Sequence, residues 1–403
     1  MGISLVRSRL FFAYILAVLG DLDYAILLVG CVLYGTQLGG STAEIGLIGG
    51  AYGLTYLFMP AILGRLGDRI PRKTSLILAA TCQIAVALYF LVYAHTVLDL
   101  IIGQLLLGVA MGFHWQSIEA FISEATGSSA KLHERGMSLF CISWSIGFMV
   151  GPLIAGIFSD YNVRDIFVFV LVTYAVDFCV AVFGIPSRPA GDKTIDNESR
   201  AEKTISMEID NPLPEDNQQQ TRVIFALLLG MMIYSITSKL LLTYFANYAK
   251  LPADLGGLAW SGTLIGEVQF CFGVGRTIYF LFGGFVKNTI KHIRLAFLGI
   301  AALLFALIFS SDPLFIATDM TLFGFLVGLI YLQTLDLLLQ REKKAKGAKA
   351  GLFESFIGLG TSLAPIVAGW LAEVSLLLPF IVYGALTGAF FVLNVILTRH
   401  KSP

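Results

Sequence analysis

Charged residues are scarce in this chain of 403 residues. Asp, Glu, Lys and Arg make up 13% of it, against 57% hydrophobic residues, and the mean hydropathy is +0.80. A water-soluble domain of this length needs a much larger polar surface, so that class of protein is excluded. Runs of about 20 apolar residues recur instead, and each is long enough to cross the hydrocarbon core of a bilayer as a helix.

Cysteine is also scarce, and the five cysteines all lie in apolar runs without forming a Cys-x-x-Cys pair. This pattern excludes a disulfide framework and a metal site, and we expect neither a metal nor a cofactor. The chain has no Gly-x-x-x-x-Gly-Lys-Ser/Thr loop, so this chain does not pump with ATP. Residues 1–9 show no small-residue cleavage site, so we expect the first apolar run to act as an uncleaved insertion signal.

Apolar runs separated by turn or charge clusters predict an all-α polytopic membrane protein with twelve transmembrane helices. The predicted spans are 10–34, 43–63, 74–94, 97–122, 136–158, 165–185, 223–246, 256–285, 293–311, 314–339, 350–372 and 376–397.

A polar stretch divides these spans into two groups of six. It runs from Pro186 to Arg222 and is rich in Pro, Asp, Glu, Asn and Gln, which is the composition of a flexible linker. We therefore expect an N-terminal six-helix bundle over residues 1–186, a cytoplasmic polar linker over 187–222 and a C-terminal six-helix bundle over 223–403.

Lys and Arg gather on one side of the predicted spans. With the N-terminus inside, all but four of the 27 lie in cytoplasmic segments, and the four are Arg164, Lys239, Lys250 and Arg276. Such a bias indicates an even number of spans with both termini in the cytoplasm. We expect an integral protein of the cell membrane that is a monomer in the lipid bilayer and binds no nucleic acid.

The two halves repeat a pattern of small residues. Four residues of span 5 recur 213 residues later in span 11: Gly147, Pro152, Ala155 and Gly156 become Gly360, Pro365, Ala368 and Gly369. Residues 43–46, which enter span 2, resemble residues 253–256, which are predicted to enter span 8. Glu124 has a near-equivalent in Asp336. These repeats favour a duplication, and duplicated bundles place the substrate path between the halves.

Residues 64–73 read Gly-Arg-Leu-Gly-Asp-Arg-Ile-Pro-Arg-Lys and lie between spans 2 and 3. They resemble the loop pattern G-x-L-a-D-R-x-G-R-K of the major facilitator superfamily of transporters, with Pro71 in place of the second glycine. Span 5 is similar to the G-x-x-x-G-P-x-x-x-G pattern of that family's drug and metabolite exporters. The resemblance covers the whole chain and implies two six-helix halves of the major facilitator type that transport a small molecule.

We interpret the charged loop as a cytoplasmic latch, because ion pairs at helix ends can bias an equilibrium between two states. The expected partner on span 4 is Glu119 or Glu124. The candidate latch residues are Gly64, Asp68, Arg69, Arg72, Glu124 and Asp336. A charge cluster that only fixes the topology is the alternative. In the second half, Lys287 occupies the place of Asp68, so that latch is expected to be degenerate.

Small residues in span 5 form a candidate helix-packing motif of Gly147, Gly151, Pro152 and Gly156. Glycines let two membrane helices approach closely, and an internal proline kinks a helix. A surface that moves against the other half and an ordinary static contact both fit this pattern.

Ionisable residues inside the spans are candidates for substrate binding or coupling, because charges at the middle of a membrane are costly. They are Asp21, Asp23, His114, Glu119, Lys239, Glu267 and Arg276. Asp21 and Asp23 are about 200° apart around a helix, so at most one of them faces a central cavity. His114 is alternatively a hydrogen-bonded structural side chain. Asp336 and Glu354 are expected near the cytoplasmic face as gate groups.

Lys239 leaves two substrate classes open. If it faces Asp21 or Asp23 across the cavity, the site suits an amphoteric or organic-anion substrate. If an acid neutralises it, the cavity favours cations or neutral amphiphiles.

The leading hypothesis is a secondary active transporter of a small molecule that works by alternating access, is coupled to protons and acts as an exporter. The alternatives are an uncoupled facilitator and a transporter-like sensor or scaffold. We do not expect an enzyme, because the chain shows neither paired metal-ligand spacing nor a nucleophile motif.

Overall fold

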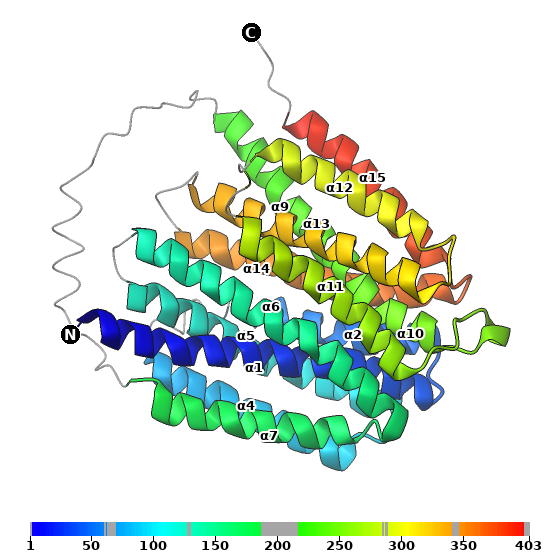
Figure 1. Cartoon of the computed structure of the whole chain (residues 1–403), viewed down its shortest axis with the longest axis horizontal. Helices are drawn as coiled ribbons and strands as arrows, with labels where there is room; N and C mark the ends of the chain where they lie inside the picture. Colours follow the sequence, from blue (N-terminus) through cyan, green and yellow to red (C-terminus); the bar gives the residue numbers. More distant parts are fainter. Residues whose placement is uncertain are drawn as a thin grey trace, which may run out of the picture.

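A computed structural model describes residues 2–59, 62, 70–126, 130–186, 217–283, 286, 289–340 and 346–398. Within these ranges all regular structure is helical (Figure 1), which confirms the all-α prediction. The N-terminal half comprises α1 (Gly2–Gln37), α2 (Thr42–Tyr56), α4 (Arg72–Tyr93), α5 (Val97–Thr126), α6 (Ala130–Tyr161), α7 (Asp165–Cys179) and the π turn η1 (Val180–Gly184). The C-terminal half comprises α9 (Asn217–Lys239), the π turn η2 (Leu240–Tyr244), α10 (Phe245–Lys250), the 3₁₀ turn η3 (Ala253–Leu255), α11 (Gly262–Phe282), α12 (Ile290–Ala306), α13 (Pro313–Gln340), α14 (Lys346–Ala372) and α15 (Leu378–Leu397).

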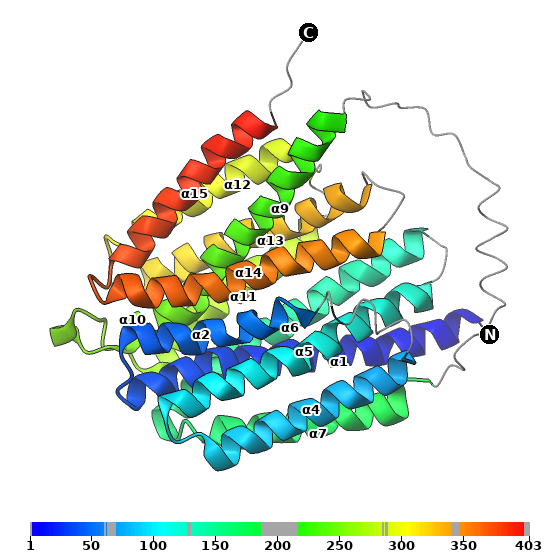
Figure 2. The same cartoon turned by 180° about the vertical axis from the view of Figure 1, so that it is seen from behind.

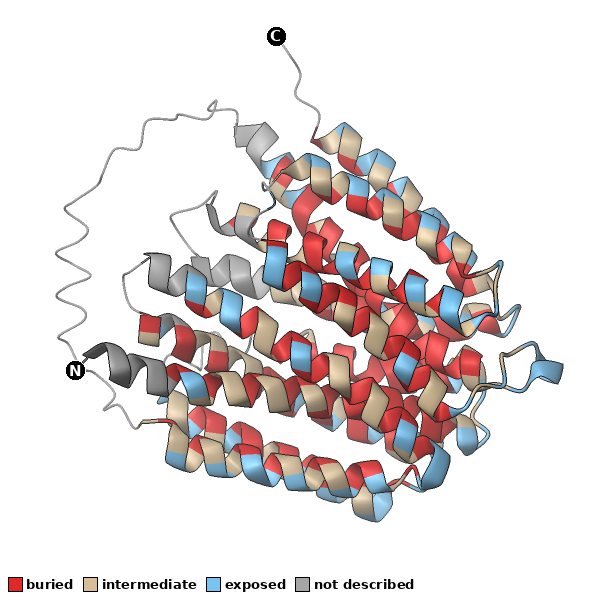
Figure 3. Cartoon of the chain, in the orientation of Figure 1, coloured by how far each residue is buried: buried red, intermediate tan, exposed pale blue. Residues whose placement is uncertain are grey.

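Nine helical segments of the described chain are long and apolar enough to cross a membrane. The helices α2, α11 and α12 occupy the places of the remaining three predicted spans. Buried residues line the faces at which the helices meet, and exposed residues cover the outer helices (Figure 3). Large apolar side chains such as Phe183 (85% exposed) and Phe309 (84% exposed) lie on that outer surface, as expected where a helix faces lipid.

Two helix starts differ from the predicted boundaries. The predicted linker extends to residue 222, but α9 already begins at Asn217, because the glutamines at 218–220 are good helix formers. Span 8 was expected from residue 256, but α11 begins at Gly262, where the side chain of Ser261 caps the first turn. Gly256 instead has a left-handed conformation (φ +85°) after η3. Residues 253–256 therefore form a turn and do not enter a span.

The two halves meet along two pairs of helices. Figures 1 and 2 show α6 beside α11 and α2 beside α14, and both pairs are in extensive contact. Backbones approach closely there: a Cβ atom added to Gly156 would lie 2.2 Å from the carbonyl oxygen of Gly262, and one added to Gly46 would lie 2.4 Å from that of Pro365. Small residues thus set the spacing between the halves.

The residues that repeat between the halves make equivalent contacts. Gly147 in α6 faces the backbone of α1, and Gly360 in α14 faces the backbone of α9. Gly266 of α11 lies against the Pro152 carbonyl, just as Gly46 of α2 lies against that of Pro365. Within the predicted packing motif, Gly147 and Gly151 therefore contact their own half. Only the Pro152–Gly156 end reaches the other half.

An acidic side chain from each half caps a helix of the other half. Both caps lie at the end of the bundle that carries the connections 38–41, 162–164, 251–261 and 373–377, which we call the distal end; the proximal end holds the start of α1 (Figure 1). Asp160, at the end of α6, accepts hydrogen bonds from the backbone N–H groups of Gly262 (2.6 Å) and Thr263 (2.8 Å) at the start of α11. Its carboxylate also lies 3.4 Å from the ammonium group of Lys250.

Glu373, at the end of α14, does the same for α2. Its Oε1 atom accepts hydrogen bonds from the hydroxyl of Thr42 (2.8 Å) and the backbone N–H of Ala43 (3.0 Å). Glu373 follows Asp160 by 213 residues, the spacing of the other repeats. The N-terminus of a helix offers free N–H donors and a partial positive charge, so each carboxylate stabilises the contact between the halves. We call Asp160 and Glu373 the distal caps.

The distal caps should hold the distal end closed. The backbone N–H of Ala43 and the hydroxyl of Thr42 keep the pKa of Glu373 below its ordinary value of 4.5. A carboxyl group with a lowered pKa contributes its full stabilisation above the ordinary value and loses it as the pH falls through the lowered one. Spin labels at Leu38 and Leu255, one in each half, should report a longer distance as the pH falls below 4.5.

Removing either charge should have the same effect at neutral pH. We expect Asp160→Asn and Glu373→Gln each to raise the population of the long distance about twofold to fivefold. Glu44→Gln is the matched control, because Glu44 lies at the same end but bonds only to Ser41 of its own half. Equal distance distributions in the cap variants and the control would show that the caps do not hold the halves together.

Candidate functional site

A central cavity lies between the two halves. Its empty space, including the part open to solvent, is about 770 Å³, which is within the range of small-molecule sites. Four helices of each half contribute: α1, α2, α5 and α6 from the first, and α9, α11, α13 and α14 from the second. The lining includes Asp21, Tyr24, Tyr52, Tyr56, Trp115, Glu119, Phe140, Trp144, Phe148, Tyr234, Ser235, Ser238, Lys239, Leu242, Arg276, Tyr331, Glu354, Ile357 and Thr361.

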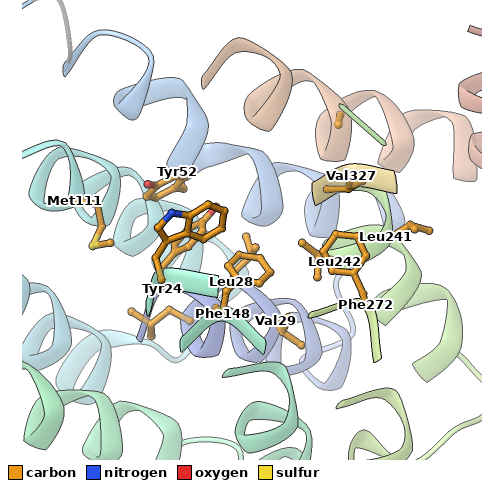
Figure 4. Packing of buried hydrophobic residues seen from close by; sticks show 14 of the residues in the cluster. Tyr24, Leu28, Val29, Tyr52, Met111, Phe148, Leu241, Leu242, Phe272 and Val327 are labelled. Atoms are coloured by element: carbon orange, nitrogen blue, oxygen red, sulfur yellow. The ribbon is translucent and has the colours of Figure 1, made fainter. Parts of the chain in front are cut away.

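Aromatic rings form most of the cavity wall. The rings of Tyr24 and Tyr52 lie 4.4 Å apart, and Figure 4 shows both beside Phe148. Trp144 meets Tyr331 edge to face at 5.4 Å. Such surfaces favour a ligand with a flat apolar body.

Lys239 enters the cavity where helix α9 changes to a π turn. Its ammonium group donates a hydrogen bond to the hydroxyl of Tyr24 (2.8 Å) and lies 4.7 Å from the centre of that ring. The π turn η2 follows at once, and the side-chain amide of the buried Gln269 donates to the carbonyls of Leu241 and Leu242, each at 3.0 Å. Figure 4 shows these two leucines packed with Phe272. A π turn inside an α-helix often marks a functional site.

Arg276 of α11 lies deeper in the same wall and is only 3% exposed. Its Nε atom donates to the hydroxyl of Ser145 on α6 (3.1 Å), and its guanidinium carbon lies 4.6 Å from the ring of Trp144 and 4.4 Å from that of Phe148. Its Nη2 atom is buried and has no hydrogen-bond partner among the described residues. A buried guanidinium with a free donor can bind an acceptor from a ligand.

Three carboxyl groups complete the cavity: Asp21, Glu119 and Glu354. The hydroxyl of Tyr56 donates to Oε2 of Glu354 (3.2 Å). Asp21 lies within electrostatic reach of Arg276 and Lys239, whereas Glu119 lies within reach of Glu354. Where side chains are described, no carboxylate oxygen comes within 4.0 Å of the nitrogens of Lys239 or Arg276. The cavity therefore has charges of both signs that do not form direct ion pairs.

The structure brings together four of the seven predicted site residues. Asp21, Glu119, Lys239 and Arg276 all line the cavity, and they come from four different helices. The remaining three, Asp23, His114 and Glu267, lie elsewhere.

Asp23 points away from the cavity, as the helical spacing from Asp21 requires. It is fully buried and accepts a hydrogen bond from the hydroxyl of Thr173 on α7 (2.5 Å). Its second oxygen, and both oxygens of the buried Asp177, have no partner among the described residues.

His114 is buried, and its Nε2 atom donates to the carbonyl of Leu16 (3.2 Å), which joins α5 to α1. This is the structural alternative that the sequence left open. Glu267 lies on the exposed face of α11, so it is not part of the cavity.

The predicted latch is only partly described. Gly64, Asp68 and Arg69 lie outside the described residues, as does the side chain of Asp336. Arg72 forms an ion pair with Glu124 (2.9 Å), but this pair joins α4 to α5 within one half. Glu119, the other expected partner on span 4, lines the cavity instead.

Several cavity residues were not predicted from the sequence. Glu354 was expected near the cytoplasmic face because span 11 was thought to begin at residue 350. Since α14 begins at Lys346, Glu354 lies two turns into the helix and reaches the cavity. The aromatic residues gave no signal, because such residues are common throughout the apolar runs.

Comparisons with known proteins agree on one family. The sequence profile described as Major Facilitator Superfamily matches residues 10–341. The chain is similar to a class E tetracycline resistance protein of Escherichia coli (24% identity, covering 64% of this chain and 60% of that protein). It is also similar to multidrug resistance protein 1 of Bacillus subtilis (22% identity, covering 84% and 83%).

Solved structures share the fold. A mutant of the nucleoside transporter NupG superposes with a TM-score of 0.73 at 16% identity, covering 97% of this chain and all of that one. The human organic anion transporter MFSD10 gives a TM-score of 0.64 at 16% identity, covering 98% and 99%. At this identity the likeness shows the fold alone.

Gln269 should stabilise the bend that presents Lys239. Gln269→Leu removes both donors to the carbonyls of the π turn, and a buried carbonyl without its partner costs about 1–3 kcal/mol. We expect a lower midpoint of thermal unfolding for the purified protein, measured by tryptophan fluorescence. Gln116→Leu is the control, because Gln116 is only half-buried. Equal midpoints for the two variants would contradict this role.

Proposed function

The chain belongs to the major facilitator superfamily of membrane transporters, and on that premise we propose that it exports a small molecule by alternating access, driven by protons. The observation that carries this proposal is the cavity between the halves, which combines an aromatic wall with buried charges of both signs. Transport rather than catalysis is therefore its proposed role.

Alternating access requires an end that closes and reopens. Among the described residues, the hydrogen bonds between the halves lie at the distal end and around the cavity. The distal caps are short polar contacts, so they can break without disturbing either half. Rocking of the halves about the cavity then exposes it to each side in turn.

The orientation follows from the distribution of Lys and Arg. We propose that the proximal end and both termini lie in the cytoplasm of a cell whose plasma membrane holds the protein as a monomer. The cavity closed at its distal end is then the state that faces inward. Residues 187–222 would tether the two bundles on the cytoplasmic side.

Proton coupling is proposed to depend on Asp21. Its carboxylate shares the cavity with Lys239 and Arg276, so a change in its charge alters how strongly the cavity binds a charged substrate. Glu119 and Glu354 form a second acidic group in the same cavity and are the further candidates for carrying a proton.

The export direction is supported by two relatives that are named as resistance proteins, one for tetracycline and one for multiple drugs. Both names describe proteins at low identity to this chain, and direction is accordingly part of the proposal.

The proposal is tested in liposomes with a proton gradient and a broad panel of metabolites and drugs. We expect at least one compound to drive proton flux. Asp21→Asn should reduce that flux about tenfold or more, because the loss of a charged partner costs about 1.5–3 kcal/mol.

Asp23→Asn and Glu267→Gln serve as matched controls, since both remove an acid from a spanning helix outside the cavity. They should keep wild-type flux. Counterflow without proton flux would favour an uncoupled facilitator, and no response to any compound would favour a sensor or scaffold.

A further inference from the structure

The cavity contains a cationic end that lacks a direct counter-charge. Lys239 and Arg276 both line it, and neither has a carboxylate oxygen within 4.0 Å among the described side chains. Asp21 supplies one negative charge in their vicinity, which leaves this end with an excess of one positive charge. The buried Nη2 atom of Arg276 has no partner among the described residues, although nearly every buried donor in a protein has one. A bound anionic group satisfies both the charge and the donor.

The acidic end has the opposite need. Glu354 and Glu119 both line the cavity, and the charge of Glu354 acts directly on Glu119. Glu354 accepts one hydrogen bond from Tyr56, a neutral group. Two neighbouring carboxylates repel each other, and a cationic group between them relieves that repulsion.

Aromatic rings connect the two ends. Tyr234 and Tyr331, whose rings lie 5.8 Å apart, face Trp144 and Tyr24 from the other half. The space of about 770 Å³ accommodates a molecule of several fused rings.

We propose that the cavity selects amphoteric aromatic molecules, with an anionic group bound by Arg276 and Lys239 and a cationic group bound by Glu119 and Glu354. This names the substrate class of the transporter proposed above and rests on that function only for its biological use. A molecule with one charge leaves one end of the cavity unpaired, and a neutral molecule leaves both ends unpaired, so selection comes from the groups that remain unsatisfied.

Three dyes test the proposal because they share a three-ring body and a pendant phenyl ring. Rhodamine B carries both a carboxylate and a cationic ring system, its ethyl ester carries the cation alone, and fluorescein carries anionic groups alone. Binding to the purified full-length protein is measured by fluorescence polarisation. We expect rhodamine B to bind about tenfold more tightly than either of the others.

Variants assign each preference to one end of the cavity. Arg276→Gln should remove the preference for rhodamine B over its ester and leave the preference over fluorescein. Glu119→Gln combined with Glu354→Gln should do the reverse. Arg164→Gln is the control, because Arg164 donates to the carbonyl of Leu91 within the first half and does not line the cavity. Thermal unfolding checks that every variant is folded.

The ester or fluorescein binding as tightly as rhodamine B would overturn the proposal, as would preferences that the two sets of variants leave unchanged. Absence of binding by all three dyes also counts against it. These results are independent of transport: the expected binding pattern without proton flux would refute the proposed function alone, and flux driven only by compounds of a single charge would refute the substrate class alone.

Discussion

Close contact between α6 and α11, and between α2 and α14, is the constraint on which the cavity depends. At Gly156 and Gly46 the backbones are so near that a single added carbon would meet a carbonyl oxygen. The same helices supply cavity residues further along: α6 presents Trp144, and α11 presents Arg276. The contacts at the distal end therefore determine how far apart the cavity walls lie. A rotation about these contacts changes the proximal separation of the walls most.

Burial of charge is the second constraint, and it follows from the first. An ionised side chain inside a membrane protein needs a polar partner or a water-filled space. Arg276 obtains one hydrogen bond from Ser145 and two aromatic faces, and Lys239 obtains a tyrosine hydroxyl. These partners are neutral, so they hold the cations in place without cancelling their charge. An ion pair at the same position would have been more stable in isolation but unable to exchange its partner for a ligand.

Hydropathy and charge bias were sufficient to predict the helical class and the order of the helices. The angle between Asp21 and Asp23 was sufficient to predict that only one of them reaches the cavity. What the sequence could not provide is the start of a helix that has no strong signal: α14 begins before the predicted span, and its earlier start moves Glu354 from the gate to the cavity.

The distal caps were a different kind of omission. Glu373 follows Asp160 by the same 213 residues that relate the small residues of spans 5 and 11. The repeat therefore contained them, but an acid at the end of a span looks like an ordinary loop residue. Only the structure shows that both accept hydrogen bonds from the first turn of a helix in the other half.

The repeat preserves the framework and not the chemistry of the cavity. Gly147 meets the backbone at Val18 and Leu22, and Gly360 meets it at Met232 and Ile236, which aligns α1 with α9. On that alignment the place of Asp21 in the first half belongs to Ser235 in the second, and both residues line the cavity.

The same comparison separates α2 from α11. Gly46 and Gly266 lie against equivalent proline carbonyls, and ten residues further on the first half has Tyr56 where the second has Arg276. A cavity built from two equivalent halves would present the same groups to both ends of a ligand. Because the substitutions at these places differ in charge, the two walls of this cavity are unlike, and a ligand that is itself unlike at its two ends fits them in a single orientation.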